Sequence, residues 1–315
     1  MLTIRMLHCI LIIFLLAPSS INAQPPDIEG WMDAVSVVEV DYNNSVRVAG
    51  TGFVAFHREE ETTFSFITNK HVIAGNDHVY IRINKDPQRD TAGTRDYMRL
   101  RVDFAPPGAI VTYNSHYYSS DSSHITVSLY QHPNDSIDVA CFLLPEWRII
   151  ARHVNAIKLS PGIHKNINLG DPALLITYIL PGHDSLVGRR SNKPIIRSGV
   201  VSSTQNDPLP YDNNGKTRFW KDTILIDALI FGGNSGSPLF INTYYPSDNG
   251  TMVFARSLIG IIVGNVPIAT FLEKKVQQDQ YLPYSKQNYG IAIAHMSDKI
   301  IETIKMIPKP STSKQ

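Results

Sequence analysis

The segment DALIFGGNSGSPLF, residues 227–240, places one serine between two glycines in a run whose composition otherwise indicates two buried strands. Glycine weakens a strand interior, so a cluster of glycines indicates a sharp turn or a close approach of the backbone to another group. Two interpretations are open at this point. The segment is a tight loop between strands, or it presents Ser235 and its neighbouring amide groups to a substrate.

A serine hydroxyl becomes a nucleophile beside a base, and that base needs a carboxylate to orient it. Of the 11 histidines, His71 follows the apolar strand-like stretch 64–68, within the sequence TNKHVI. Asp138 directly precedes the apolar run VACFLL, where a buried carboxylate is costly unless it is hydrogen-bonded. A histidine N–H group would satisfy that carboxylate. These three residue types together could transfer an acyl group.

Each of the three residues also has a purely structural explanation. His71 fits a hydrogen-bonded histidine at a strand end, and Asp138 fits a turn residue before a strand. Ser235 fits a polar residue in a glycine-rich hairpin. Their order along the chain nevertheless favours a catalytic set, because three independent local contexts occur in an order known for nucleophilic hydrolases.

The elements that would position these residues are mostly short β-strands. Stretches rich in Val, Ile, Phe and Tyr are separated by turn residues, a pattern typical of barrels or sandwiches rather than alternating strands and helices. Near the end, apolar residues at helical spacing over 297–307 follow a Ser-Asp cap and stop at Pro308. We predict a mainly β fold with a C-terminal helix. The expected strands cover residues 34–40, 52–56, 63–68, 78–83, 125–130, 139–144, 173–178, 198–203, 223–230 and 258–263.

The first residues have the features of an export signal. Arg5 precedes a short apolar run, and the small residue Ala23 lies at a plausible cleavage point. The apolar run is shorter than the roughly 20 residues that a membrane anchor needs. We therefore expect residues 1–23 to be a cleaved signal peptide, and the mature protein to be periplasmic or secreted without stable membrane insertion.

Charge and cysteine content indicate which partners and which cellular origin to expect for the protein. The chain has 29 basic and 28 acidic residues, so no nucleic-acid partner is expected. Cys9 lies in the expected signal, which leaves Cys141 without an intramolecular disulfide partner. An exported protein without disulfides favours a bacterial origin. Cys141 itself lies in an apolar run, and we expect it to be buried in the core.

These motifs resemble those of the trypsin-like serine proteases, which have the chymotrypsin fold and form the PA clan. The resemblance is to the disulfide-poor bacterial type related to the high-temperature-requirement proteases. TNKHVI resembles the family's histidine motif, IDVACFLL its aspartate strand and GGNSGSPLF its serine loop. GTGFVAF, RSGVVSS and SLIGIIVGN also resemble family segments, and the similarity extends from about residue 35 to residue 304. We expect no PDZ peptide-binding module.

The resemblance implies two six-stranded antiparallel β-barrels, with the active site in the cleft between them. The first barrel would comprise residues 24–160 and would carry the histidine and aspartate motifs. The second would comprise residues 161–308, with the serine motif and the C-terminal helix. Residues 309–315 would form a tail.

The same resemblance implies a role for each site residue. Ser235 would be the nucleophile, His71 the general base and then the general acid, and Asp138 the residue that orients His71. The backbone N–H groups of Gly233 and Ser235 would form an oxyanion hole. The substrate would be a polypeptide with small or medium aliphatic side chains, and no cofactor or metal is expected. The specificity pocket would have Leu229 at its base and Val263, Gly264 and Asn265 in its wall.

Three positions depart from the family's pattern. Ser237 replaces a commoner glycine, and Lys70 replaces the usual alanine. Asn234 precedes the serine where trypsin-like zymogens carry an aspartate that pairs with a freed N-terminus. We therefore expect an oxyanion loop that forms without activating cleavage beyond signal removal.

Two other functions stay open. The domain could be a catalytically inert peptide-binding module of the same fold, or an esterase that uses the same three residues. The oligomeric state is open as well.

Overall fold

The computed structural model describes twelve stretches of the chain. The expected signal peptide at 1–23, the expected barrel boundary at 160 and 161, and the expected tail at 309–315 lie outside them. No helix in these stretches is long and apolar enough to cross a bilayer. The described residues are 28–43, 45–56, 64–84, 97–105, 122–144, 156–159, 167–178, 194–204, 209–213, 216–246, 252–269 and 286–308.

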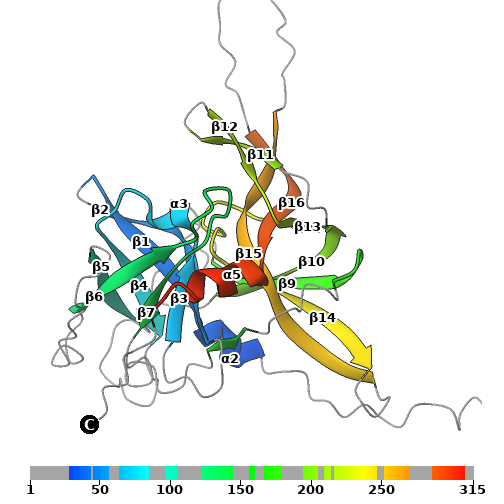
Figure 1. Cartoon of the computed structure of the whole chain (residues 1–315), viewed down its shortest axis with the longest axis horizontal. Helices are drawn as coiled ribbons and strands as arrows, with labels where there is room; N and C mark the ends of the chain where they lie inside the picture. The colour runs from blue at the N-terminus through cyan, green and yellow to red at the C-terminus, as the bar shows by residue number, and fades with distance from the viewer. Residues whose placement is uncertain are drawn as a thin grey trace, which may run out of the picture.

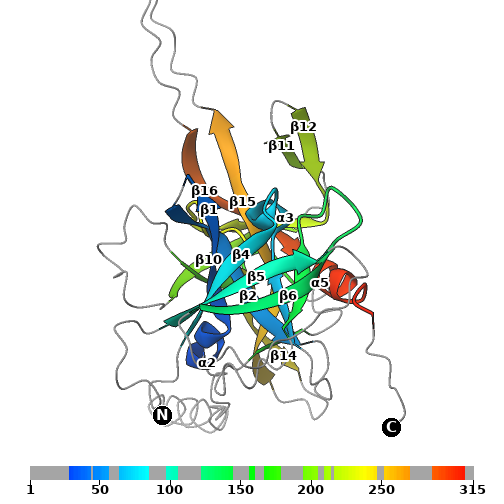
Figure 2. The same cartoon turned by 90° about the vertical axis from the view of Figure 1, so that its left-hand side faces the viewer.

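Among the described residues, seven strands close the first barrel (Figures 1 and 2). Their order around it is β1-β4-β5-β6-β7-β3-β2, with β2 paired again to β1, and β8 lies beside β2. The large side chains of Phe66, Ile81, Leu100 and Phe142 fill the interior. The strands are β1 (Val35–Tyr42), β2 (Ser45–Phe56), β3 (Phe64–Thr68), β4 (His78–Asn84), β5 (Tyr97–Ala105), β6 (Ser122–Gln131), β7 (Ala140–Leu144) and β8 (Ile157–Lys158).

The prediction of six antiparallel strands is wrong for this barrel. The strands β5 and β6 pair in parallel, with Arg101 opposite His124. Parallel neighbours cannot be joined by a hairpin and need a crossover of a dozen or more residues. The sequence between Ala105 and Ser122 is long enough for such a crossover. Apolar alternation identifies a strand but carries no information on the direction of its neighbour.

The second barrel agrees with the prediction. Its six strands close in the order β10-β13-β16-β15-β14-β9, and every pair is antiparallel. A separate hairpin lies between β10 and β13 in the chain. The strands are β9 (Pro172–Thr177), β10 (Ile195–Ser203), β13 (Thr223–Asp227), β14 (Pro238–Pro246), β15 (Met252–Ala269) and β16 (Lys286–Met296), and the hairpin is β11 (Leu209–Asn213) with β12 (Lys216–Trp220).

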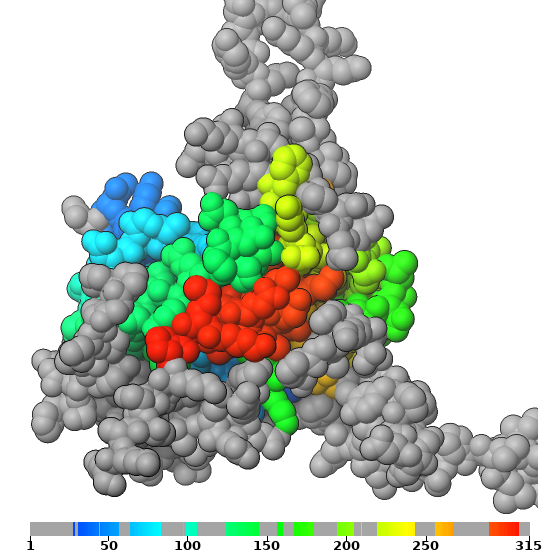
Figure 3. All heavy atoms as spheres, viewed as in Figure 1, coloured from blue at the N-terminus to red at the C-terminus, as the bar shows by residue number. Residues whose placement is uncertain are grey.

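Within the described stretches, three helices flank the barrels: α2 (Ile28–Asp33), α3 (Lys70–Ile73) and α5 (Ser297–Ile304). The predicted C-terminal helix is α5. It contacts β6 and β7 of the first barrel as well as β15 and β16 of the second. Figure 3 shows α5, in red, on the surface against the green residues of the first barrel. The helix therefore bridges the two barrels.

One cluster of buried apolar residues belongs to both barrels. Ile67 and Cys141 of the first barrel share it with Phe240 of the second and Ile301 of α5. Trp31 of α2 stacks on Phe240 with ring centroids 4.5 Å apart. Cys141 is buried, as predicted, and burial raises the pKa of its thiol. This shared core sets how the barrels lie against each other, and therefore how their loops meet.

Candidate active site

His71 lies on the single turn of α3, directly after β3 ends at Thr68. Its ring Nδ1 is hydrogen-bonded to the Oδ2 atom of Asp138. Its backbone N–H donates to Oδ1 of the same carboxylate at 3.1 Å. Both carboxylate oxygens therefore face His71. A carboxylate at Nδ1 holds the ring proton there and leaves Nε2 able to accept a proton.

The electrostatics of this pair favour an ionised Asp138 and a basic His71. Burial opposes the charge on His71, but the hydrogen bond and charge of Asp138 raise its pKa above the ordinary value. Burial likewise opposes ionisation of Asp138, yet the hydrogen bonds and charge of His71 lower the carboxyl pKa below its ordinary value. The His71 side chain is 48% exposed and that of Asp138 is 10% exposed. The imidazole is reachable while its carboxylate partner is not.

Asp138 lies near the end of the segment between β6 and β7, and we name residues 132–138 of this segment the aspartate loop. Its carbonyl oxygen accepts a 2.6 Å hydrogen bond from Nδ2 of Asn69 in the first barrel. Its N–H donates at 2.9 Å to Nε2 of His295, a buried residue of the second barrel. Sequence reasoning did not find His295. The available signal was one titratable residue within the apolar stretch GIAIAHM.

The serine loop, residues 231–237, is held by the side chain of Asn234. This amide is fully buried and makes three hydrogen bonds. Its Nδ2 donates to Thr177 Oγ1 and to the Tyr178 carbonyl, each at 2.7 Å. Its Oδ1 accepts from the Phe231 N–H at 2.6 Å. An uncharged side chain therefore does the anchoring.

The predicted oxyanion donors are free within the described part of the chain. The N–H of Asn234 donates to the Phe231 carbonyl at 3.1 Å, and that of Gly236 donates to Ile262 at 2.8 Å. The N–H groups of Gly233 and Ser235 donate to no described residue. Buried backbone donors are normally paired. Two free donors around the serine are what an oxyanion site requires.

The Ser235 hydroxyl donates to the Val263 carbonyl oxygen at 2.9 Å. Within the described stretches it makes no hydrogen bond to His71. The two residues nevertheless come from segments that meet at Gly50. A Cβ atom on Gly50 would lie 2.6 Å from Cγ2 of Val72, which follows His71, and 2.9 Å from the Ser235 carbonyl oxygen. The structure therefore brings the histidine turn and the serine loop together across one glycine.

The positions expected to line the specificity pocket lie around the serine loop. Leu229 is 48% exposed, and its carbonyl accepts a 3.1 Å hydrogen bond from Arg197. Val263 is buried. A Cβ atom on Gly264 would lie 3.5 Å from Cη2 of Trp220, so the expected pocket wall faces the β11–β12 hairpin. Asn265 lies next on β15, opposite Ala292 of β16.

The residues that depart from the family's pattern have partners. Lys70 Nζ donates to the Asn134 carbonyl in the aspartate loop at 3.0 Å. Ser237 Oγ donates to Thr177 Oγ1 at 2.7 Å, so this serine is accommodated by a hydrogen bond. No group of three or more metal-ligating side chains among the described residues is placed to hold an ion.

A family model described as a trypsin-like peptidase domain matches residues 50–244 of the chain. Solved structures are similar at low sequence identity. The HtrA-type protease AlgW with decapeptide has 16% identity and a TM-score of 0.46, covering 88% of this chain and 65% of that chain. The MamO protease domain from Magnetospirillum magneticum has 12% identity and a TM-score of 0.45, covering 90% of this chain and 100% of that chain. The active form of the Rv3671c protease from M. tuberculosis has 15% identity and a TM-score of 0.49, covering 94% of this chain and 95% of that chain. No curated protein matches.

The close packing of the serine loop predicts a large effect for Gly236→Ala. Gly236 has φ +88°, and an added Cβ atom would lie 1.8 Å from the Thr51 carbonyl oxygen. Left-handed strain and the clash together should lower the free energy of unfolding by more than about 3 kcal/mol. Gly75→Ala is the matched control, because φ is +74° there and no atom lies within 4 Å. It should cost about 1 kcal/mol. Urea unfolding measures both, and equal losses would contradict the packing argument.

Proposed function

The chain belongs to the trypsin-like peptidase family, and from this premise we propose that it is an exported serine endopeptidase. The observation that carries the proposal is the pairing of His71 Nδ1 with the buried carboxylate of Asp138, beside a serine loop with two free N–H donors. Export is proposed from the signal-like residues 1–23. The substrate is a polypeptide.

The proposed reaction proceeds through an acyl-enzyme. The Ser235 hydroxyl leaves the Val263 carbonyl and turns to His71, whose Nε2 takes the proton while Oγ attacks the scissile carbonyl carbon. Asp138 stabilises the imidazolium that forms. His71 then gives this proton to the leaving amine. A water molecule repeats the sequence, releasing the acid product and restoring the Ser235 hydroxyl.

The N–H groups of Gly233 and Ser235 are proposed to bind the oxyanion of both tetrahedral intermediates. In the described part of the chain they have no other acceptor, so they need not break a hydrogen bond to do so. Loss of one such donor typically costs ~3 kcal/mol of transition-state stabilisation. This term is proposed to be a large share of the rate enhancement.

Reaction with a fluorophosphonate probe tests the proposed nucleophile. We expect one label, mapped by mass spectrometry to Ser235, and none in Ser235→Ala. His71→Ala should slow labelling by about 10²- to 10⁴-fold, because the general base is lost. Ser202→Ala, at an exposed serine, is the control and should label like the wild type. A wild-type protein that does not label would make the inert-module alternative correct, and faster hydrolysis of esters than of peptides would favour the esterase.

The pH dependence of labelling tests the His71–Asp138 pair. The reactive form has a neutral imidazole, so the rate should rise with pH through the pKa of His71. Because Asp138 raises that pKa, the midpoint should lie above the ordinary value of about 6.5. Labelling rates measured from pH 5 to 9 give the midpoint. A midpoint below 6.5 would contradict the proposed pairing.

Selectivity is proposed to favour small or medium aliphatic side chains at the cleaved bond. Leu229 offers no charge to a Lys or Arg head group, and the cationic Arg197 binds its carbonyl. A Lys or Arg side chain bound at Leu229 would therefore lie near the positive charge of Arg197 and would have no acidic partner there. A peptide library with cleavage-site sequencing measures the preference. Dominant cleavage after Arg or Lys would contradict this assignment and point to the exposed Asp227, two residues before Leu229.

Activity is proposed not to require a freed N-terminus. Asn234 holds the serine loop by three hydrogen bonds to neutral groups, so no ammonium is needed to form the loop. The test is residues 24–315 with a removable N-terminal tag. Rates of Ser235 labelling before and after tag removal should agree within about twofold. Labelling that starts only on tag removal would show that the N-terminus completes the site.

A further inference from the structure

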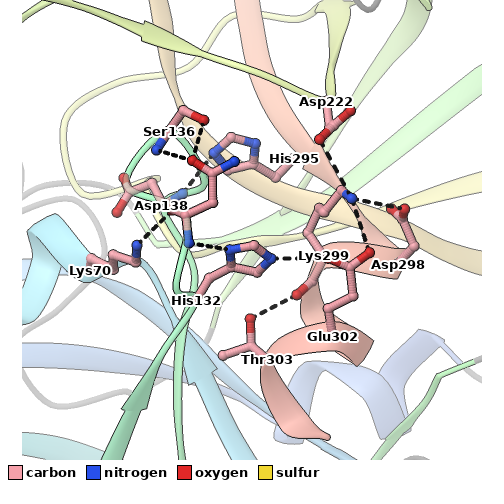
Figure 4. A network of polar contacts seen from close by, with 11 residues as sticks. Lys70, His132, Ser136, Asp138, Asp222, His295, Asp298, Lys299, Glu302 and Thr303 are labelled. Carbon is pink, nitrogen blue, oxygen red and sulfur yellow. Dashed lines mark hydrogen bonds and ion pairs between the residues drawn. The ribbon is translucent and has the colours of Figure 1, made fainter. Parts of the chain in front are cut away.

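Side chains of the second barrel and of α5 make polar contacts with the aspartate loop (Figure 4). His132, at the start of the loop, accepts the Asn134 N–H at Nδ1 over 3.1 Å. Its Nε2 must then carry the proton, and it meets Glu302 of α5 at 3.0 Å. Lys299 binds Glu302 at 3.0 Å and lies 3.5 Å from Asp222. This chain of contacts runs from the loop across α5 to the second barrel.

A shorter contact reaches Asp138 itself. The N–H of Asp138 donates at 2.9 Å to Nε2 of His295 on β16, and both residues are buried. The Nδ1 atom of His295 has no hydrogen-bond partner in the described part of the chain. The backbone groups of Lys221 and Asp222 lie near the ring and favour a proton on it.

The contact requires one tautomer of His295. An Nε2 atom that accepts an N–H cannot carry a proton, so the neutral ring must be protonated at Nδ1. The alternative tautomer and the imidazolium would each point an N–H at the N–H of Asp138. Only the neutral Nδ1–H form holds the loop.

The surroundings of His295 keep it in that form. Burial lowers its pKa to about 4, against the opposing charges of Asp138 and Asp222 and the backbone groups of Lys221 and Asp222. The cross-strand neighbour of His295 on β15 is the apolar Ile261. The negative charge of Asp222 is offset by the ammonium group of Lys299 on α5. His295 therefore stays neutral over the range in which His71 titrates.

We infer that His295 is a positioning residue, which fixes the main chain of Asp138 from the second barrel and so holds the carboxylate at His71. Asn69 fixes the carbonyl of Asp138 from the first barrel, and His295 fixes its N–H from the second. Without His295 the N–H is buried with no acceptor, and the loop shifts to solvate it. The catalytic meaning of this inference rests on the proposed function, whereas the geometric part does not.

Two variants of similar shape separate the acceptor from packing. His295→Gln retains an oxygen that can accept the Asp138 N–H, and His295→Met fills similar space with only a weakly accepting sulfur. Histidine ¹⁵N NMR titration measures the pKa of His71 in each folded protein. In His295→Met we expect this pKa to fall towards about 6.5, because Asp138 no longer faces the ring. In His295→Gln it should stay above that value.

The control is Ser297→Ala, which removes another buried side-chain atom without a partner at the same junction. It should leave the pKa of His71 unchanged.

Fluorophosphonate labelling of Ser235 should slow by about 10- to 100-fold in His295→Met, as for a displacement of about 1 Å at an active site, and should largely recover in His295→Gln.

The ¹⁵N shifts of wild-type His295 test the inference without any variant. We expect a proton on Nδ1 and none on Nε2 at pH 7. A proton on Nε2, or an unchanged pKa of His71 in His295→Met, would overturn the inference. A wild-type protein that does not label at Ser235 would instead overturn the proposed function, and the titration of His71 would still decide the role of His295.

Discussion

The buried carboxylate of Asp138 is the group on which the rest of the site depends. An ionised carboxylate out of water is very unfavourable unless donors surround it. His71 supplies two of them, one from its ring and one from its main chain. The pairing can persist only if Asp138 and His71 keep their places, so their surroundings must hold both. This requirement explains why Asn69 and His295 hold the main chain of Asp138 from the two sides.

The two barrels hold each other's site segments. The aspartate loop belongs to the first barrel and is fixed by His295 of the second. The serine loop belongs to the second barrel and rests on β2 of the first, where Thr51 binds the carbonyls of Ser235 at 2.8 Å and Gly233 at 2.7 Å. The shared apolar core stabilises the association of the barrels but is not directional. The hydrogen bonds across the junction are directional, and they fix where the aspartate loop and the serine loop lie relative to each other.

Local sequence was enough to single out candidate site residues. A histidine after an apolar strand, an aspartate before one and a serine among glycines could each be singled out as a candidate, and α5 followed the periodicity of its residues. The closed second barrel came from the family resemblance, because residue pattern indicated only four of its strands, β9, β10, β13 and β15. Contacts distant in sequence could not be predicted. His295 lies 157 residues from Asp138, and the parallel pairing of β5 with β6 depends on the path of the chain between them. Side-chain pattern shows which residues are buried, but not which neighbour they meet.

The neutral character of Asn234 gives the serine loop a different physical basis from an ion pair. A buried ion pair needs its partner in place, because one charge alone would be left without solvent. An amide needs only acceptors and donors, and Asn234 finds them in Thr177, Tyr178 and Phe231 of its own barrel. Tyr178 in turn donates its hydroxyl to the Val35 carbonyl of the first barrel at 3.0 Å. Through Asn234 and Tyr178, the serine loop is thus tied to the barrel junction by hydrogen bonds between neutral groups.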